Sequence, residues 1–195
     1  ESATIHYETV DPPEPLRTGD RTHSVKTTNK TPVTRYTSES REIYSVAVDT
    51  RGGSPRLLAG ATSPHWGPQV FRSDDLGATW TETPGGAVRF PEDTGVALER
   101  IWQLRPAPAD QPGVVYAGTE PSALFRSTDG GETFELVRGL WDHPHRPTWA
   151  PGGGGQAIHT VVPHPSDEQV VTVAMSTGGV HRTEDAGDSW TPFNR

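Results

Sequence analysis

Short apolar runs separated by turn residues fill the chain from residue 43 onward, and they recur in the same order three times. In each copy the first run alternates apolar and polar positions, the pattern of a half-buried β-strand. A second run of small apolar residues is continuous, and a third, shorter run follows it. The first strands are predicted at 43–46, 101–104 and 158–161, the second at 57–60, 115–118 and 172–175, and the third at 70–72, 124–126 and 180–182. No strongly helical stretch is apparent, so we predict an all-β fold built from a repeated unit.

A second regularity follows the third strand of each copy, where the chain reads Ser/Thr-x-Asp-x-Gly-x-Thr/Ser-Trp/Phe. The Ser/Thr and Asp side chains are expected to hydrogen-bond nearby backbone N–H groups, and the Gly to supply a positive-φ position. The Thr/Ser begins a fourth strand, and the aromatic residue next to it is expected to point between neighbouring units. The motif residues are Ser73, Asp75, Gly77 and Trp80, then Ser127, Asp129, Gly131 and Phe134, and finally Thr183, Asp185, Gly187 and Trp190.

This motif and its place in a four-stranded unit resemble the Asp-box, or BNR, repeat of sialidases, sortilin-type receptors and bacterial glycosyl-hydrolase-like propellers. The segments 118–127 and 149–155 are also similar to bacterial propeller proteins described as BNR-repeat or sialidase-like. The resemblance covers residues 43–195 and implies a β-propeller with four-stranded antiparallel blades at about 43–83, 101–136 and 158–195. Propellers close with about four to eight blades, so we expect this chain to be a portion of a larger propeller, or to need other chains to close the ring.

Residues 1–42 have a different composition, rich in Ser, Thr and Pro and without a strand or helix period. We expect this segment to be poorly ordered, because it holds too little apolar surface to bury. The alternative is that it adds one or two strands around 5–7 and 33–36.

The composition of the 195 residues excludes several classes of chemistry. The chain has no Cys, which rules out disulfides, thiolate metal sites and cysteine nucleophiles. A net charge of −8 argues against a nucleic-acid partner. No apolar run approaches the ~18 residues of a membrane span. The absence of a signal peptide favours the cytoplasm, although residue 1 is Glu rather than Met, which leaves the compartment open.

In a propeller the first strand of each blade is innermost, and the Asp-box turns share one face with the turns between first and second strands. A ligand site is therefore expected on the opposite face, where the connections at about 84–100 and 137–157 are long. Aromatic rings beside polar donors on this rim suit a carbohydrate or another polar small ligand. The ligand-binding candidates are His65, Trp66, Arg100, Trp102, Glu120, Trp141, His143 and His159.

Two alternatives to a non-catalytic binding propeller stay open. The resemblance implies a glycoside hydrolase, for which Glu120 and Asp142 are the candidate catalytic carboxylates. The Phe/Tyr-Arg-Ile-Pro motif of sialidases is absent, however, and Arg89-Phe90-Pro91 does not match it. The other alternative is a scaffold that assembles with a protein partner or with the remaining propeller blades.

We expect neither a metal ion nor a cofactor. The Asp-box acids have a structural role and lack the further acidic ligands of an EF-hand loop. His143 and His145 could bind a metal ion together with His159, but a His-Pro-His loop more often lies at the surface. His181 falls where the other two units have Phe, which predicts a structural strand residue. The glycine run 152–155 does not follow a strand as a phosphate-binding loop does.

Overall fold

The computed structural model describes residues 42–63, 67–83, 88–151 and 155–194. The predictions for residues 1–41 and for His65 and Trp66 lie outside these described residues. Almost all regular structure in the described part is β-strand, and twelve strands form three antiparallel four-stranded sheets. The all-β prediction and the prediction of four-stranded antiparallel units are therefore confirmed.

Each sheet is a simple meander, in which consecutive strands along the chain are neighbours in the sheet. The first sheet contains β1 (Glu42–Asp49), β2 (Arg56–Ser63), β3 (Gly67–Ser73) and β4 (Thr81–Glu82). The second contains β5 (Arg100–Pro106), β6 (Val115–Glu120), β7 (Ala123–Ser127) and β8 (Glu135–Leu136). The third contains β9 (Ile158–Pro163), β10 (Val171–Met175), β11 (Gly179–Thr183) and β12 (Thr191–Pro192). The strands extend past the apolar runs that predicted them, because backbone pairing continues into polar residues such as Ser63, which pairs with Gly67.

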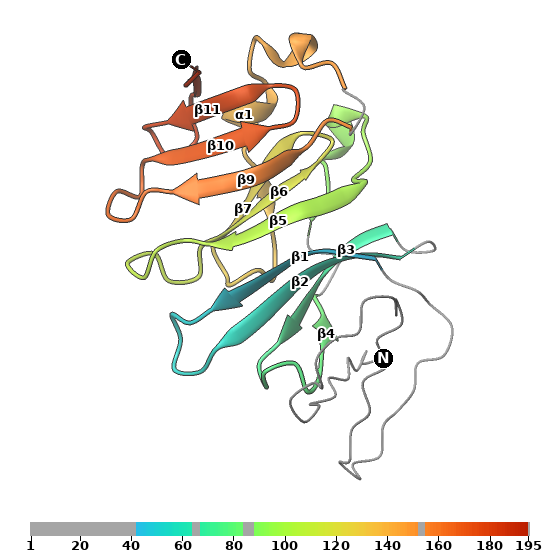
Figure 1. Cartoon of the computed structure of the whole chain (residues 1–195), viewed down its shortest axis with the longest axis vertical. Helices are drawn as coiled ribbons and strands as arrows, with labels where there is room; N and C mark the ends of the chain where they lie inside the picture. The colour runs from blue at the N-terminus through green and yellow to red at the C-terminus, as the bar shows by residue number, and fades with distance from the viewer. Residues whose placement is uncertain (1–41, 64–66, 84–87, 152–154, 195) are drawn as a thin grey trace, which may run out of the picture.

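The sheets lie one after another, and the first strands β1, β5 and β9 lie side by side and run in the same direction (Figure 1). Side-chain bonds join these inner strands. The Ser45 hydroxyl donates to the Ile101 carbonyl at 3.2 Å, and the Gln103 amide oxygen accepts from the Val161 backbone N–H. The first strands are thus packed together from sheet to sheet, while β4, β8 and β12 form the outer edges.

Two apolar clusters hold neighbouring sheets together. The first contains side chains of the first two sheets, among them Leu58, Val70, Ile101, Val115 and Phe125. The second joins the second and third sheets through side chains that include Tyr116, Leu124, Ile158, Val173 and Trp190. Full burial of one Val, Leu, Ile or Phe side chain contributes roughly 1.5–3 kcal/mol, so these clusters are the main source of stability between the sheets.

Glycine on the second strand lets the next sheet approach closely. A Cβ atom at Gly118 of β6 would lie 2.5 Å from the carbonyl oxygen of Ile158 on β9. Gly60 of β2 stands in the same relation to Ile101 of β5, where a Cβ would lie 3.0 Å from the isoleucine Cβ. The glycine at the end of this apolar run therefore sets how closely the second strand of one sheet approaches the inner strand of the next sheet.

The turns of the three sheets divide between two ends. The β5–β6 turn touches the β7–β8 turn, since the N–H of Gly130 donates to the carbonyl of Gly113 at 2.8 Å. The third sheet repeats this contact, with the N–H of Ala186 donating to the carbonyl of Gln169 at 2.9 Å. The three Ser/Thr-x-Asp-x-Gly hairpins, which we call Asp-box hairpins after the repeat that they resemble, follow the third strand of their sheet, so they lie at this end.

The opposite end carries the β6–β7 and β10–β11 turns and the connections between sheets. The sequence predicted no helices in these connections, but they contain the short helices η1 (Glu92–Thr94), α1 (Arg138–Trp141) and η2 (Arg146–Thr148). No helix of the described residues is long and apolar enough to cross a membrane.

Candidate functional site

The Asp-box hairpins are closed by one hydrogen-bond pattern. In the first, the Ser73 hydroxyl donates to Asp75 Oδ1 at 2.7 Å and accepts from the Gly77 N–H at 2.8 Å. Asp75 also accepts from the backbone N–H of Thr79 at 2.8 Å and from its hydroxyl at 2.6 Å. The same bonds recur in the other hairpins, where the partners are Ser127, Asp129, Gly131 and Thr133, and Thr183, Asp185, Gly187 and Ser189.

These bonds stabilise the ionised carboxylates. Hydrogen bonds from Thr79 and Ser73 lower the pKa of Asp75 to about 2, and those from Ser189 and Thr183 lower the pKa of Asp185 to about 2. Around Asp129 burial acts to raise the pKa, but the hydrogen bonds outweigh it and the pKa falls to about 2. All three acids remain charged and paired at neutral pH, which suits a structural role and not proton transfer.

The aromatic residue of each hairpin packs against protein. Phe134 belongs to the cluster between the first and second sheets, and Trp190 to the cluster between the second and third. Trp80 packs with residues of its own sheet, including Phe71. Trp190 also donates its indole N–H to the carbonyl of Gly187 at 3.1 Å, which ties the ring to its own hairpin.

At the opposite end, every sheet has a β-bulge at the start of its inner strand. In the first sheet the pairing jumps from Ile43 to Ser45, which leaves Tyr44 without a partner position on β2. The second sheet skips Trp102, and the third skips His159. A bulge leaves the extra residue out of the ladder and redirects its side chain. Tyr44, Trp102 and His159 are therefore equivalent positions at the same end of three neighbouring strands.

The predicted site residue Glu120 binds this bulged segment. It is the last residue of β6, where a loop position was expected, and its side chain is about one-tenth exposed. Glu120 Oε2 accepts from the guanidinium of Arg100 at 2.9 Å and from the indole N–H of Trp102 at 2.9 Å. The structure thus brings together three of the residues that the sequence predicted for the rim.

Tyr44 completes this group. Its ring lies edge-on to the Trp102 ring at 5.3 Å, and the Arg100 guanidinium lies 5.3 Å from the Tyr44 ring centre. Hydrogen bonds to Tyr44 and then to Glu120 raise the pKa of Arg100 above its usual value, so the guanidinium stays charged. Tyr44, Arg100 and Trp102 are partly exposed, while His159 is exposed. We call Tyr44, Arg100, Trp102, Glu120 and His159 the rim site.

Other predicted residues lie elsewhere. Trp141 and His143 were expected on the exposed rim, but both are buried with only 8% of their surface exposed. Trp141 packs against Phe90 at 4.8 Å, because α1 turns the ring toward the interior. Asp142 is exposed, and within the described residues no hydrogen bond or ion pair joins it to Glu120.

Arg146 lies in the connection after α1 and was not among the ligand-binding candidates chosen from the sequence. Its guanidinium lies 3.3 Å from the centre of the Trp141 ring and donates to the Ser122 carbonyl at 2.7 Å. Burial lowers the pKa of Arg146 to about 10, against the opposing influence of Asp142. The hydrogen bond to Ser122 holds the connection after α1 against the β6–β7 turn, and the cation–π contact with Trp141 orients the guanidinium. In the sequence, Arg146 is marked only by its place in the His-Pro-His-Arg-Pro run that follows Trp141.

A cleft at the Asp-box end offers a weaker site. It lies between the first two sheets and is lined by residues that include Asp49, Arg51, Arg56 and Asp74. Arg51 forms two bonds to Asp49, and Arg56 donates to Asp74 at 2.7 Å. These charges satisfy each other, so the cleft presents few free groups to a ligand.

The sequence matches no protein-family model and no curated protein. Among solved structures, the chain is similar to the GH74 enzyme of Niastella koreensis (18% identity, TM-score 0.54, 78% of this chain and 22% of that chain). It is also similar to the GH74 xyloglucanase from Xanthomonas campestris (24% identity, TM-score 0.53, 77% and 23%). The sheets are β-propeller blades. A further similar structure is YCF48 from Cyanidioschyzon merolae (14% identity, TM-score 0.49, 78% and 37%).

These matches cover only part of the similar proteins, so the activities of those proteins do not transfer to this chain. The three blades span less than a quarter of the length of either GH74 structure. At such identities the likeness concerns the fold, since one fold hosts many activities. Function has to be argued from the side chains of the rim site.

Proposed function

We propose that these blades form part of a propeller that binds a carbohydrate or another polar small ligand at the rim site, without catalysing its conversion. The observation that carries this proposal is the bulge repeated in all three blades. It places Tyr44, Trp102 and His159 at one end of the inner strands, opposite the Asp-box hairpins. A repeated departure from regular pairing is a feature that redirects side chains toward a site.

The chemistry of the rim supports this ligand class. Tyr44 and Trp102 offer flat rings that cover the apolar face of a sugar, and Arg100 and His159 offer donors at their edges. Glu120 holds Arg100 and Trp102 by hydrogen bonds, which reduces the side-chain entropy lost when a ligand binds.

Catalysis by Glu120 and Asp142 has less support. A glycosidase needs two carboxyl groups that flank the scissile bond, about 5–9.5 Å apart. Glu120 Oε2 is already engaged with two donors, and Asp142 is an exposed residue at the end of α1. The names of the GH74 neighbours suggest that hydrolysis is worth assaying, but their likeness to this chain is one of fold.

The proposal includes further blades, from a longer chain or from partner chains, because several large apolar side chains of the inner strands are exposed. Val46 is 61% exposed, Val48 55% and Val162 51%. Additional inner strands beside β1 and β9 would cover such surface, as happens between the described blades.

The test is to screen the protein against an array of neutral and acidic oligosaccharides and to measure hits by isothermal titration calorimetry. Trp102→Ala is expected to weaken binding about tenfold or more, since stacking and its hydrogen bond are both lost. His159→Ala should weaken binding as well. The matched control is His164→Ala, just past the other end of β9, which should leave the affinity unchanged. Unchanged affinity in both rim variants would refute the site. Release of reducing sugar by the wild-type protein, lost in Glu120→Gln, would establish a hydrolase instead.

A further inference from the structure

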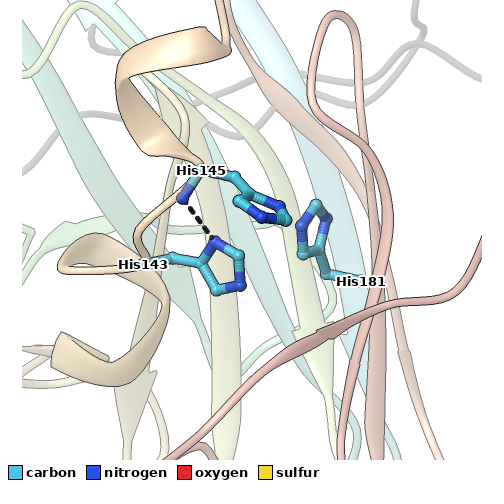
Figure 2. Close-up of side chains that lie close together, drawn as sticks. All are labelled: His143, His145 and His181. Atoms are coloured by element: carbon cyan, nitrogen blue, oxygen red, sulfur yellow. Dashed lines mark hydrogen bonds between the residues drawn. The ribbon is translucent and has the colours of Figure 1, made fainter.

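Three histidines converge in the segment between the second and third blades, away from the rim site. His143 and His145 follow α1, and His181 lies on β11 (Figure 2). One ring nitrogen from each residue lies within 4.8 Å of the corresponding nitrogen in the other two. The sequence analysis considered His143 and His145 with His159, but the structure brings His181 into the group instead.

His181 is the unusual member of this group. The residue is 1% exposed, and neither ring nitrogen has a hydrogen-bond partner among the described residues. A buried polar group without a partner is rare in native proteins and points to a water or an ion. The equivalent positions in the other two blades are Phe71 and Phe125, which need no partner. Only the third blade has an imidazole at this buried position.

His143 is oriented for coordination by its surroundings. Its Nε2 lies 3.1 Å from the carbonyl oxygen of Trp190, so the Nε2 proton is donated there and the lone pair resides on Nδ1. Donation of the second ring N–H to a backbone carbonyl is the usual support for a metal-bound histidine. The ring also stacks on Trp149 at 5.7 Å, which limits its rotation.

We propose that His143, His145 and His181 bind one divalent transition-metal ion, with Zn²⁺ as the best-fitting ion. Imidazole nitrogen is a preferred ligand of Zn²⁺, and three histidines leave the fourth tetrahedral position open. His181 is buried and neither of its ring nitrogens has a hydrogen-bond partner among the described residues, so a ring lone pair is available to a metal.

The geometry requires a small closure. Zn–N bonds of about 2.0–2.1 Å place tetrahedral ligand nitrogens roughly 3.3 Å apart, closer than the 4.8 Å limit of the cluster. His145 is the residue that can move, because it is exposed and its ring forms no hydrogen bond to a described residue. Its backbone N–H donates to His143 Nδ1 at 3.1 Å, and metal binding would exchange that bond for a coordinate bond.

The consequence of binding would be a link between two blades. Residues 143–145 belong to the connection that leaves the second blade, and His181 belongs to the third. An ion bound to all three would fix this connection against β11, in a region where Trp149 already contacts the ring of His181 at 5.1 Å. The rim site lies at one end of β1, β5, β6 and β9, whereas this metal site lies between β11 and the connection after α1, so the ion would stabilise the blades without touching a rim ligand.

The test begins with tag-free protein that has been treated with chelator and desalted. Zn²⁺ binding is measured by equilibrium dialysis with elemental analysis, and Co²⁺ binding by the visible absorption of tetrahedral cobalt. We expect one ion per chain, a tetrahedral cobalt spectrum and a higher unfolding temperature when Zn²⁺ is present. Absence of stoichiometric binding by the wild-type protein would overturn the proposal.

Variants separate this site from adventitious binding to surface histidines. His181→Phe restores the residue type found in the first two blades and should abolish stoichiometric binding. His145→Ala alters an exposed residue and should weaken Zn²⁺ affinity by at least about tenfold, with the fold intact. His164→Ala, which removes an exposed histidine elsewhere, should bind as the wild type does. Wild-type affinity in His145→Ala or His181→Phe would refute the assignment, and if His181→Phe does not fold, His145→Ala alone decides.

Discussion

The carboxylate of Glu120 accepts a hydrogen bond from the indole N–H of Trp102 at 2.9 Å, across the β5–β6 pair. Trp102 is the bulged residue of its strand, so this bond fixes a side chain that the sheet ladder does not hold. Arg100 binds the same carboxylate oxygen at 2.9 Å. One acid therefore positions both an aromatic ring and a positive charge at the proposed ligand site.

Removal of this acid should affect stability and ligand binding together. We expect Glu120→Ala to lower the free energy of unfolding by about 1–3 kcal/mol, because Arg100 and Trp102 lose their acceptor. Glu120→Gln keeps one acceptor oxygen and should have a smaller effect. Chemical denaturation gives the stability and calorimetry the affinity. Glu135→Ala, at an exposed residue of β8, is the control, and an equal loss in both alanine variants would contradict the role given to Glu120.

Arg51 is predicted to be the strongest single polar contact between the first two blades. Its side chain is 9% exposed, and Nη1 donates to the carbonyls of Ala107, Gln111 and Val114 at 3.2, 2.8 and 2.8 Å. Arg51→Met should destabilise the protein by about 2–4 kcal/mol, because the carboxylate of Asp49 loses its guanidinium partner and each of the three carbonyls loses a charged donor. Urea denaturation measures this loss.

Arg51→Lys should recover little of that stability, since a single ammonium group cannot reproduce the planar fork of the guanidinium. Arg105→Met is the matched control, because Arg105 is exposed on β5. A change in Arg51→Met no larger than that in Arg105→Met would contradict the prediction.

The Asp boxes predict a specific response to acid. Asp75, Asp129 and Asp185 each have a pKa of about 2, below the ordinary value of 3.8 for this side chain. The folded state thus binds these protons less readily than the unfolded state, so the stability that they contribute is complete above pH 4. That stability should fall as the pH decreases from about 4 to 2. Unfolding midpoints in urea, measured across this range, report the decline.

Neutral substitution should remove part of this pH dependence. The asparagine amide in Asp129→Asn cannot ionise. The unfolding midpoint of this variant should therefore change less between pH 4 and 2 than that of the wild type. Asp110→Asn, at an exposed turn residue, serves as the comparison. A decline in Asp129→Asn as steep as that of the wild type would mean that other carboxylates cause the acid sensitivity.

Gly118 should tolerate no side chain. The added methyl group of Gly118→Ala would meet the backbone carbonyl of Ile158 at 2.5 Å, and a strand backbone cannot retreat without disturbing the inner strands. We expect a loss of roughly 1–3 kcal/mol, as for overpacked cores. Gly53→Ala is the control, because a Cβ there meets nothing within 4 Å. Thermal unfolding of the two variants, compared with the wild type, tests this prediction.

The repeat allowed much of the fold to be predicted from the sequence. Three four-stranded units could be located from the spacing of Ile43, Ile101 and Ile158 and from the Ser/Thr-x-Asp-x-Gly turn that follows in each copy. The turn is predictable because its hydrogen bonds join residues close in sequence. The strand ends were less predictable, since pairing into polar residues depends on the neighbouring strand. The helices in the connections were missed because each is shorter than two turns and carries no helical period.

The candidate site was only partly predictable. Arg100, Trp102 and Glu120 were chosen for their place at one end of the strands, and the structure joins them. The bulges were not predicted, although Ile101 and Leu104 are buried three positions apart, a spacing that strict alternation does not produce. The proximity of His143 to His181 arises from tertiary packing across 38 positions of chain, which a local pattern does not encode.

The side chain at each bulge takes no part in the pairing that holds its blade together. Because backbone pairing resumes after the extra residue, substitution there leaves the register of the strand unchanged. The three positions already carry a phenol, an indole and an imidazole on equivalent backbones. The side chains at these three positions can therefore be exchanged one blade at a time, which would let the chemistry of the proposed ligand site change while the sheets stay the same.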